Sequence, residues 1–506
     1  MEVWQSLAHG FGIALSPGNL LFALVGSVVG TITGVLPGIG PLGAMAILLS
    51  FTFYMDATTA MIFFAGIYYG AMYGGSTTSI LLNIPGEAAS VVTCLDGYEM
   101  AKKGRAGAAL TVSAVGSFVA GNISILGLMI AAPLLGNAAL KFGPPEFVAI
   151  GLCGLILLVR LEEGSVIQSL IMILLGLGIS TVGTDYLSGT LRFTLGIEQL
   201  AQGMELLPVA MGLFGIAEVL DTAARDQEAT RLIKVRLREL LPSRREWKRS
   251  VSPVFRGSFL GFLIGLIPGP SPVISTFVSY FTEKRLSKHP EEFGKGAIEG
   301  VAGPESANNS AVGAAYVPLM ALGIPFTPAM AMVLGALMLH NITPGPNMIQ
   351  QKPDLFWGVI AAMYIGNFML VLLNLPMVNL FVSILRIPKP ILFPIIVLLC
   401  LVGVYSVNAS YVDLFAMALF GIIGYALKEV GFKPAPLILA MVIGPMVENS
   451  LRQALMISGG ELAPLVLRPI CLTLYSVAFC GVVAPWVLRK WKSGRSKPAN
   501  PLTGNR

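Results

Sequence analysis

The stretch Leu36-Pro37-Gly38-Ile39-Gly40-Pro41 interrupts a long apolar segment, and Ile267-Pro268-Gly269-Pro270-Ser271-Pro272 interrupts a second one. Proline has no amide hydrogen, so a helix that stops here leaves backbone N–H and C=O groups for which lipid offers no partner. Such interruptions are tolerated at membrane depth where they surround a polar cavity. Two of them in corresponding halves of one chain are typical of a secondary transporter whose substrate lies between broken helices.

The composition is that of a membrane protein. Hydrophobic residues make up 55% of the 506-residue chain and charged residues only 12%, compared with about 25% charged in an ordinary soluble domain. Apolar segments long enough to cross a bilayer, which takes about 20 residues, recur at residues 20–36, 106–135, 356–385, 393–407 and 464–488. We therefore predict an all-α polytopic protein with about 12 transmembrane helices. The five cysteines form no C-x-x-C pair, which argues against a zinc site or a disulfide framework.

Basic residues divide the chain into parts. Residues 224–252 contain nine Lys and Arg against four acidic residues, and residues 489–506 contain six and no acidic residue. An excess of Lys and Arg marks cytoplasmic loops, so we place this linker and this tail in the cytoplasm. We expect two transmembrane repeats, at residues 1–223 and 253–488. Because the basic segments carry few aromatic residues, a nucleic-acid partner is not expected.

Self-similarity supports the two repeats. Residues 30–38 align with residues 261–269 around the first pair of interruptions, and residues 79–86 align with residues 319–326 around a second Pro-containing pair. A single proline in a membrane helix is usually a simple kink, but four breaks in matching order favour two related halves. Each half is expected to contain broken or re-entrant helices, and an inverted orientation of the halves is our hypothesis.

Small and hydroxyl-bearing residues flank the breaks. Buried hydroxyls and amides need partners, so such clusters mark either close helix packing or a ligand site. Packing is a serious alternative for Gly70, Gly74 and Gly75, and a weaker one for the adjacent amides of Asn308 and Asn309. Half-helices that begin after a break present free N–H groups and a positive dipole end, which favour a carboxylate. The candidate substrate-binding residues are Pro37, Gly38, Gly40, Ser76, Thr77, Thr78, Pro85, Gly86, Gly269, Ser271, Asn308, Asn309 and Pro325.

A coupling cation is the second expected ligand. Glu305 lies inside a polar run in an apolar region, and an ionisable group at membrane depth is functional by default. Oxygen-bearing groups suit a hard cation such as sodium, and the candidate residues are Asn83, Glu305, Asn309 and Ser310. Glu87 follows the third break, where it could serve in coupling, cap a helix or pair with Lys102, Lys103 or Arg105. No cofactor is expected beyond sodium or a proton.

Other titratable residues have structural interpretations. Asp56, Asp185 and Glu448 are expected to end spans at the membrane interface. His340 ends an apolar stretch before a Pro-rich turn. It could carry a proton, but a structural role is favoured.

Several long motifs resemble the large membrane subunit (TctA type) of the tripartite tricarboxylate transporters. The resemblance covers about residues 20–485. The motifs that carry it are residues 34–41, 69–87, 96–100, 104–107, 304–309 and 322–325. In one departure, Phe326 follows the second-half Gly-Ile-Pro where the family pattern leads us to expect a small residue, which leaves the identity of the carried acid open.

The resemblance implies a function that composition and spacing do not show. It implies a bacterial inner-membrane importer that works with a periplasmic solute-binding protein (TctC type) and a small four-span membrane subunit (TctB type), driven by an ion gradient. Relatives carry citrate, other tricarboxylates and dicarboxylates, and aromatic acids. The absence of a G-x-x-x-x-G-K-[ST] motif agrees with transport that does not use ATP.

Two alternatives come from other classes. A channel or exporter without a binding protein is disfavoured, because the resemblance is to a multi-subunit system. An intramembrane enzyme is also disfavoured, because the sequence has no H-E-x-x-H motif, no clustered Asp pair and no nucleophile with a His base.

Overall fold

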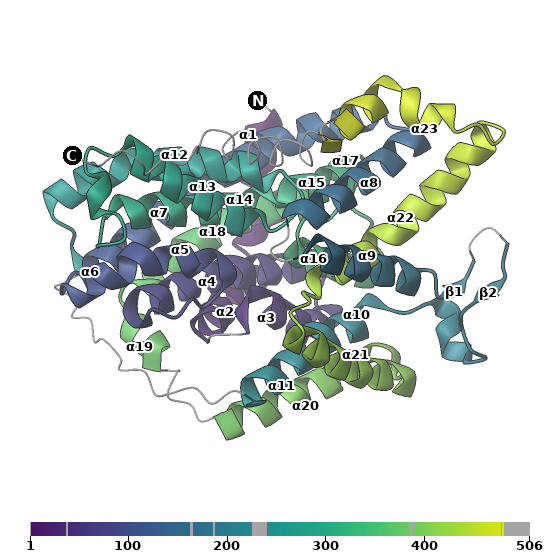
Figure 1. The fold of residues 1–506 in the computed structure, drawn as a ribbon, viewed down its shortest axis with the longest axis horizontal. Helices are drawn as coiled ribbons and strands as arrows, with labels where there is room; N and C mark the ends of the chain where they lie inside the picture. The colour runs from purple at the N-terminus through teal and green to yellow at the C-terminus, as the bar shows by residue number, and fades with distance from the viewer. Residues whose placement is uncertain are drawn as a thin grey trace, which may run out of the picture.

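The computed structural model describes residues 2–36, 39–161, 165–185, 188–224, 240–383, 389–476 and 478–479. These residues form a helical bundle in which the described strands, β1 (Gly183–Thr184) and β2 (Leu191–Arg192), make one short antiparallel pair (Figure 1). The first half contains α1 (Glu2–Ala14), α2 (Pro17–Val35), α3 (Gly40–Leu48), η1 (Leu49–Tyr54), α4 (Ala57–Leu82), η2 (Ala88–Ser90), α5 (Val91–Thr93), η3 (Cys94–Tyr98), α6 (Glu99–Lys102), α7 (Ala106–Ala139), α8 (Pro144–Leu161), α9 (Val166–Ser180), η4 (Glu198–Gln202), α10 (Leu206–Ala210), η5 (Met211–Ile216) and α11 (Ala217–Ala224). The second half contains α12 (Arg244–Gly265), α13 (Ser271–Leu286), η7 (Pro290–Glu292), α14 (Glu299–Ala314), α15 (Tyr316–Leu322), α16 (Pro328–Leu339), α17 (Met348–Gln351), α18 (Pro353–Asn374), α19 (Val378–Ser383), α20 (Lys389–Asn408), α21 (Tyr411–Glu429), α22 (Ala435–Ile457) and α23 (Ala463–Leu467).

Helix length and composition agree with a multi-pass membrane protein. Among the described residues, 5 segments are long and apolar enough to cross a bilayer: Pro17–Val35, Ala106–Ala139, Leu206–Ala224, Pro353–Asn374 and Tyr411–Glu429. Shorter apolar segments lie at Gly40–Tyr54, Pro144–Val159, Val166–Ser180, Pro328–Leu339 and Phe393–Asn408. The all-α class is therefore confirmed, whereas the count of about 12 crossings stays a prediction.

Helices end at the interruptions that the sequence indicates. The helix α2 ends at Val35 and α3 begins at Gly40, with Pro37 and Gly38 outside the described residues. In the second half, α12 ends at Gly265 and α13 begins at Ser271.

The second pair of breaks has matching backbone geometry. The residue after α4, Asn83, is left-handed with φ 58°, and the residue after α15, Gly323, is left-handed with φ 74°. A left-handed residue just past a helix is a common way to stop it. The two second-half breaks also meet, because the amide of Gly269 donates to the carbonyl of Phe326 at 2.9 Å.

The centre of the bundle is formed by α4 and α14, which are buried from residue 59 to 82 and from residue 300 to 314. Each is crossed at close range by a Gly-bearing helix. A Cβ atom at Gly26, Gly30 or Gly34 of α2 would lie within 2.4 Å of the α4 carbonyls of Phe63, Ile67 and Ala71. A Cβ atom at Gly257, Gly261 or Gly265 of α12 would lie within 2.6 Å of the α14 carbonyls of Gly303, Ala307 and Ala311. Both contacts use the four-residue spacing of small residues that lets membrane helices approach closely.

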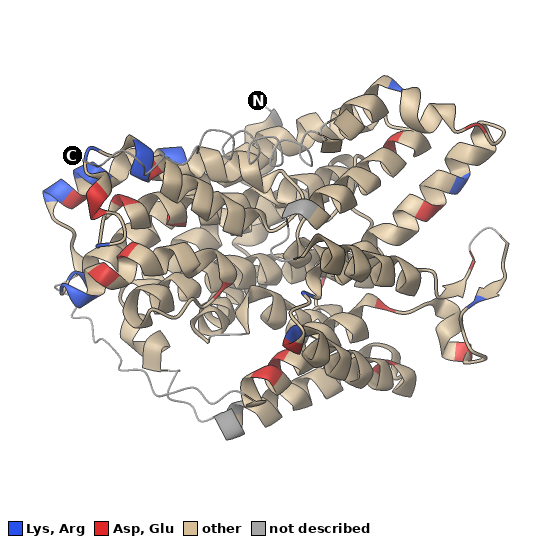
Figure 2. Ribbon diagram, in the orientation of Figure 1, with Lys and Arg blue, Asp and Glu red and all other residues tan. Residues whose placement is uncertain are grey.

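Lys and Arg residues gather at one end of the molecule, over α6, the start of α12 and the end of α13 (Figure 2). Ion pairs attach α12 to its neighbours, with Arg105, just before α7, bound to Glu246, Arg249 bound to Glu292 of η7 and Glu299 of α14, and Arg256 bound to Glu283 of α13. Most of the predicted cytoplasmic linker (225–239) and the whole basic tail lie outside the described residues. The repeat boundaries at 1–223 and 253–488 stay predictions.

Candidate functional site

The centre of the candidate site is Glu305 on α14, which is fully buried. Its carboxylate accepts hydrogen bonds from the hydroxyls of Ser76 on α4 and Thr93 on α5, and Ser113 on α7 adds a third hydroxyl. Among the described residues, no Lys, Arg or His forms an ion pair with Glu305. A buried carboxylate without a basic partner is costly when charged, so this position can hold a proton or attract a cation.

Two amides extend the cluster along α14. Asn308 donates to Glu87 Oε1 at 3.2 Å, and Asn309 donates to Ser117 Oγ at 2.7 Å and to the carbonyl of Glu305 at 3.2 Å. The Oδ1 atoms of both amides are buried and have no hydrogen-bond partner. An unsatisfied buried acceptor costs about 1–3 kcal/mol, and carbonyl oxygens are ligands that hard cations prefer. The two unpartnered Oδ1 atoms and the Glu305 carboxylate therefore lie on one helix, α14, and all three are groups whose oxygen atoms can bind a cation.

Glu87 caps a short helix. Its side chain accepts from the amide of Ala89 at 2.8 Å at the start of η2. The alternative of pairing with a nearby base is wrong, because Lys102 pairs with Glu99, Lys103 donates to the carbonyl of Lys295, and Arg105 pairs with Glu246. Its contact with Asn308 nevertheless connects this capped turn to the Glu305 cluster.

Other predicted hydroxyls donate to backbone carbonyls. Thr77 donates to the carbonyl of Tyr73 at 3.1 Å and Thr78 to that of Gly75 at 3.0 Å, both within α4, and Ser310 donates to that of Ser258 on α12 at 2.6 Å. A hydroxyl has one hydrogen to donate, so Thr77 and Thr78 would have to leave these bonds to donate to a carboxylate, and Ser76 shares its hydrogen between Glu305 and the carbonyl of Met72. The oxygen of Ser310 can still contact a cation, and that role stays a prediction. In contrast, Ser271 Oγ is buried without a partner.

The remaining predicted residues differ in their environments. Gly86 is a packing residue, because a Cβ atom there would lie 2.0 Å from the carbonyl oxygen of Gly34. Asn83 and Pro85 are exposed, so Asn83 does not join the buried oxygens around Glu305, while Pro325 and Gly269 are buried. The structure therefore brings Ser76, Glu305, Asn308 and Asn309 of the predicted set into one polar cluster, and their binding of substrate or cation stays a prediction.

Two of the four half-helix starts are open to an anion. Thr327 caps α16 by accepting from the amide of Met330, and Glu87 caps η2, whereas α3 and α13 have no side-chain cap. The first residue of α13 is Ser271, with its unpartnered hydroxyl. The first residue of α3 is Gly40, where a Cβ atom would meet no atom of the described residues within 4 Å. Uncapped N–H groups at a helix start favour a carboxylate.

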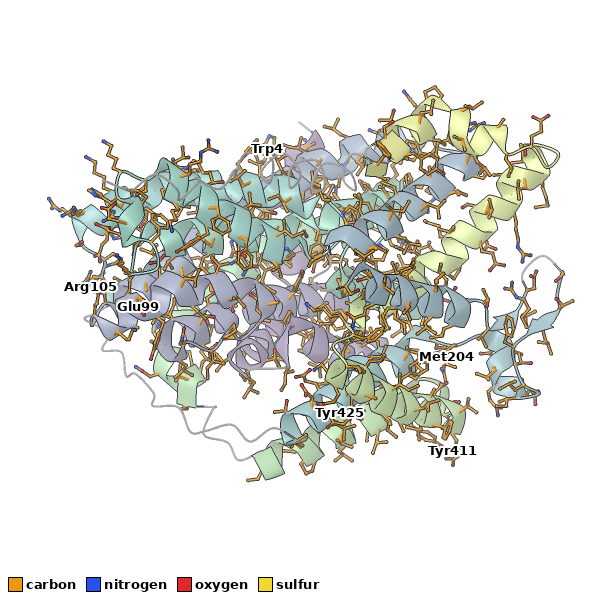
Figure 3. The ribbon with its side chains drawn as sticks, in the orientation of Figure 1. Trp4, Glu99, Arg105, Met204, Tyr411 and Tyr425 are labelled. Atoms are coloured by element: carbon orange, nitrogen blue, oxygen red, sulfur yellow. The ribbon has the colours of Figure 1, made fainter. Side chains whose placement is uncertain are left out.

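A cavity of about 460 Å³ lies elsewhere, where β1–β2 and α22 meet. Met204, labelled in Figure 3, is one of its lining residues. Asp185 and Glu448, expected to end spans, line it together with two arginines. Arg192 lies 2.7 Å from Glu448, and Arg452 lies 2.9 Å from Asp185 and 2.6 Å from Glu448.

This ring of charges does not make an anion site. Two arginines face Asp185 and Glu448, and Glu205 adds a third carboxylate to the lining. The sequence contained one signal of the ring, the four-residue spacing of Glu448 and Arg452 on one helix face. The partner Arg192 gave no such signal, because it is 256 positions from Glu448.

Other predictions concern metals and histidine. His340 lies 2.9 Å from the carbonyl of Thr52 through its Nε2 atom, in agreement with a structural role. Cys94, Cys153, Cys400 and Cys471 are free, and Cys480 is outside the described residues. In the described part of the chain, no group of three His, Cys, Asp or Glu residues could hold a metal ion.

The helical bundle with several membrane-length apolar segments defines a multi-pass membrane protein, and sequence comparison gives its family. Residues 20–439 match the Tripartite tricarboxylate transporter TctA family, so the chain belongs to that family and is a component of a tripartite transport system. A protein of Agrobacterium vitis named "Uncharacterized 52.8 kDa protein in TAR-I ttuC' 3'region" is 47% identical over 98% of this chain and 99% of its own length. A second protein of that organism, named "Uncharacterized protein in TAR-II ttuC' 3'region", is 50% identical over 44% of this chain and 92% of its own length. No solved structure matches the chain.

Proposed function

We propose that the chain is the membrane subunit that carries a small organic carboxylate into a bacterial cell across the inner membrane, driven by a sodium or proton gradient. Its partners are a periplasmic solute-binding protein of the TctC type, which delivers the acid, and a small four-span subunit of the TctB type. Membership of the TctA family supports transport rather than catalysis. The substrate is a tricarboxylate, a dicarboxylate or a related acid.

The halves of the transporter are, in this proposal, two repeats whose broken helices face each other. In α4, Ile67 contacts α2, and Asn83 is the residue that follows the helix. In the second half, Ala307 contacts α12, and Gly323 is the residue that follows α15. The same number of positions separates the contact from the helix end in both halves. The segments after the breaks also contact across the halves, since α13 packs on η2 and α16 packs on α3. Such packing of a broken segment of one half on the other half is expected in a transporter with paired discontinuous helices.

The substrate site lies between the uncapped starts of α3 and α13. These two helices flank the central pair, because α3 packs on α4 and α13 packs on α14. The positive dipole ends of these two helices favour a carboxylate, and Ser271 supplies a hydroxyl. An anion can then be held at membrane depth without an arginine.

The coupling cation binds next to the substrate, at Glu305 and the free oxygens of Asn308 and Asn309. The observation that carries this proposal is the buried Glu305 carboxylate, which bridges both halves through Ser76 and Thr93 with hydroxyls as its only described partners. A proton or a sodium ion would neutralise it. Loss of that ion would leave the buried carboxylate charge without a partner and so disfavour the occupied state.

Uptake by reconstituted vesicles tests this function. The purified chain and its small membrane subunit are placed in liposomes with the binding protein outside, and radiolabelled citrate, succinate and benzoate are supplied in turn. We expect one acid to accumulate when a sodium or proton gradient is imposed, and accumulation to stop when an ionophore collapses the gradient. Uptake that requires ATP, or equal passage of all three acids without a gradient, would contradict the proposal.

A further inference from the structure

A second cavity, of about 300 Å³, lies at the basic end of the molecule, between the start of α12 and the end of α13. Its charged lining residues are Arg245, Arg249, Arg256, Lys288, Glu283 and Glu299. These belong to the region where Lys and Arg gather in Figure 2. The cavity is separate from the Glu305 cluster and plays no part in the proposed transport step.

The cavity keeps positive charge after its internal ion pairs are counted. Arg249 is bound to Glu299 at 2.7 Å and to Glu292, which lies beside the lining, at 2.6 Å, and Arg256 is bound to Glu283. Lys288 and Arg245 are exposed and form no ion pair or hydrogen bond within the described residues. Four basic side chains therefore face the two carboxylates of the lining and Glu292 beside it, and this excess of positive charge favours an anionic ligand.

An apolar stripe on α12 begins directly beside the cavity. Val251, Phe255, Phe259 and Leu263 are 52%, 57%, 64% and 45% exposed, and their four-residue spacing places them on one face of the helix. Val251 and Phe255 immediately precede Ser252 and Arg256, which line the cavity. A ligand with an anionic head and long apolar chains would therefore match both surfaces at once.

We propose that this cavity binds the headgroup of an anionic phospholipid of the cytoplasmic leaflet, with its acyl chains lying along the α12 stripe. The excess of Lys and Arg identifies this end as the cytoplasmic one, and basic pockets between helices on that side suit anionic headgroups. A soluble phosphate would use the cavity but not the stripe, so the adjoining apolar face selects lipid.

The test measures thermal unfolding of the full-length chain in a zwitterionic detergent while lipid is titrated. Dioleoyl phosphatidylglycerol is compared with dioleoyl phosphatidylcholine and with inorganic phosphate. We expect phosphatidylglycerol alone to raise the midpoint saturably. In the double variant Arg245→Gln/Lys288→Gln its apparent affinity is expected to fall about 30-fold, since each basic residue near an anionic surface contributes about 1 kcal/mol.

A matched double variant, Lys284→Gln/Arg285→Gln, removes the same charge from exposed positions of α13 that do not line the cavity. It is expected to keep the wild-type lipid response. An equal loss in both double variants would show diffuse attraction to charged lipid and overturn the proposal. So would an unchanged response in Arg245→Gln/Lys288→Gln, or an equal shift with inorganic phosphate. Because the readout is unfolding and not uptake, failure here leaves the transport proposal standing.

Discussion

At the scale of single residues, the proposed coupling depends on Glu305. Among the described residues, the carboxylate of Glu305 accepts hydrogen bonds from hydroxyl groups and has no basic partner. The bonds from Ser76 and Thr93 reach it from two segments of the first half, while Glu305 itself belongs to the second. A change in its charge would therefore be felt on both sides of the contact between α4 and α14. This is the position at which ion binding and movement of the halves can be coupled.

Replacing Glu305 with Gln should separate exchange from accumulation. Gln keeps the size and one acceptor oxygen, and the hydroxyl of Ser76 or Thr93 that faces its amide nitrogen can accept a hydrogen bond instead of donating one, but Gln cannot release a proton or pair with a cation. We expect gradient-driven accumulation to fall to the level of empty vesicles, while exchange of labelled for unlabelled substrate persists. The measurement is uptake with and without a gradient, with the exposed Glu461→Gln as control. Normal accumulation by Glu305→Gln would remove Glu305 from coupling.

Replacing Asn309 or Ser76 with Leu should abolish uptake without loss of membrane insertion. In Asn309→Leu the amide that joins α14 to Ser117 on α7 is lost, and in Ser76→Leu the hydroxyl that joins α4 to Glu305 on α14 is lost. The control is Asn122→Leu, because the Asn122 amide bonds only the carbonyl of Phe118 in its own helix. Wild-type uptake rates for both Asn309→Leu and Ser76→Leu, measured at matched protein levels, would discredit the site.

At the scale of helices, close packing holds the broken segments in place. The glycines of α2 and α12 let the backbones of α4 and α14 approach, so the ends of α2 and α12 carry the breaks to the central polar cluster. The ion pairs of Arg249 and Arg256 then attach the basic end of α12 to the loop at η7, α14 and α13. Packing and ion pairs should therefore respond differently to mutation and to pH.

Gly261→Val should destabilise the folded chain by about 1–3 kcal/mol, the usual range for overpacking. The Cβ atom would lie 2.2 Å from the backbone carbonyl oxygen of Ala307, which cannot move without shifting α14. Thermal unfolding in detergent measures the effect. In the control Gly154→Ala, where no atom lies within 4 Å, stability should hold or rise, since Ala favours a helix by about 0.5–1 kcal/mol. Equal midpoints for the two variants would refute the tight contact.

The ion pair between Arg249 and Glu292 of η7 should make the stability of the folded chain fall at low pH. Arg249 donates a hydrogen bond to Glu292 and lowers the pKa of that carboxyl below its usual value. A lowered folded pKa stabilises the folded chain above the unfolded pKa of about 4.3, and this stabilisation disappears as the pH falls through the folded value. We expect Glu292→Gln to flatten the fall in unfolding midpoint between about pH 5 and pH 3. A variant that keeps the full wild-type acid dependence would exclude this contribution.

The breaks could be predicted from sequence because their cause is local. Pro-Gly inside an apolar stretch disfavours continuation of a helix, and α3 and α13 begin at Gly40 and Ser271 as the alignment indicates. The helix contacts pair Ile67 with Ala307 and the left-handed ends pair Asn83 with Gly323, in the register of the aligned residues 79–86 and 319–326. The hydrogen-bond partners of Glu305 could not be predicted, because contacts between segments far apart in the sequence determine them.

At the scale of the whole molecule, the distribution of Lys and Arg distinguishes the two ends of the bundle. Lys and Arg gather at the end formed by α6, α12 and α13, and β1–β2 lies toward the opposite end (Figures 1 and 2). The candidate transport site lies between these ends, where α4 and α14 meet. In the proposed function, the basic end lies on the cytoplasmic side and the opposite end is the side on which the binding protein delivers substrate.

Substrate protection of two engineered cysteines tests the central claim, that broken helices of both halves hold one carboxylate between them. In a chain whose native cysteines are replaced, Ile39→Cys and Ser271→Cys mark the starts of α3 and α13, and the exposed Ser165→Cys serves as control. The account predicts that the carried acid slows the reaction of a thiol reagent at both marked positions with the same concentration dependence, and leaves the control unchanged. Protection at neither position, or at only one of them, would contradict it.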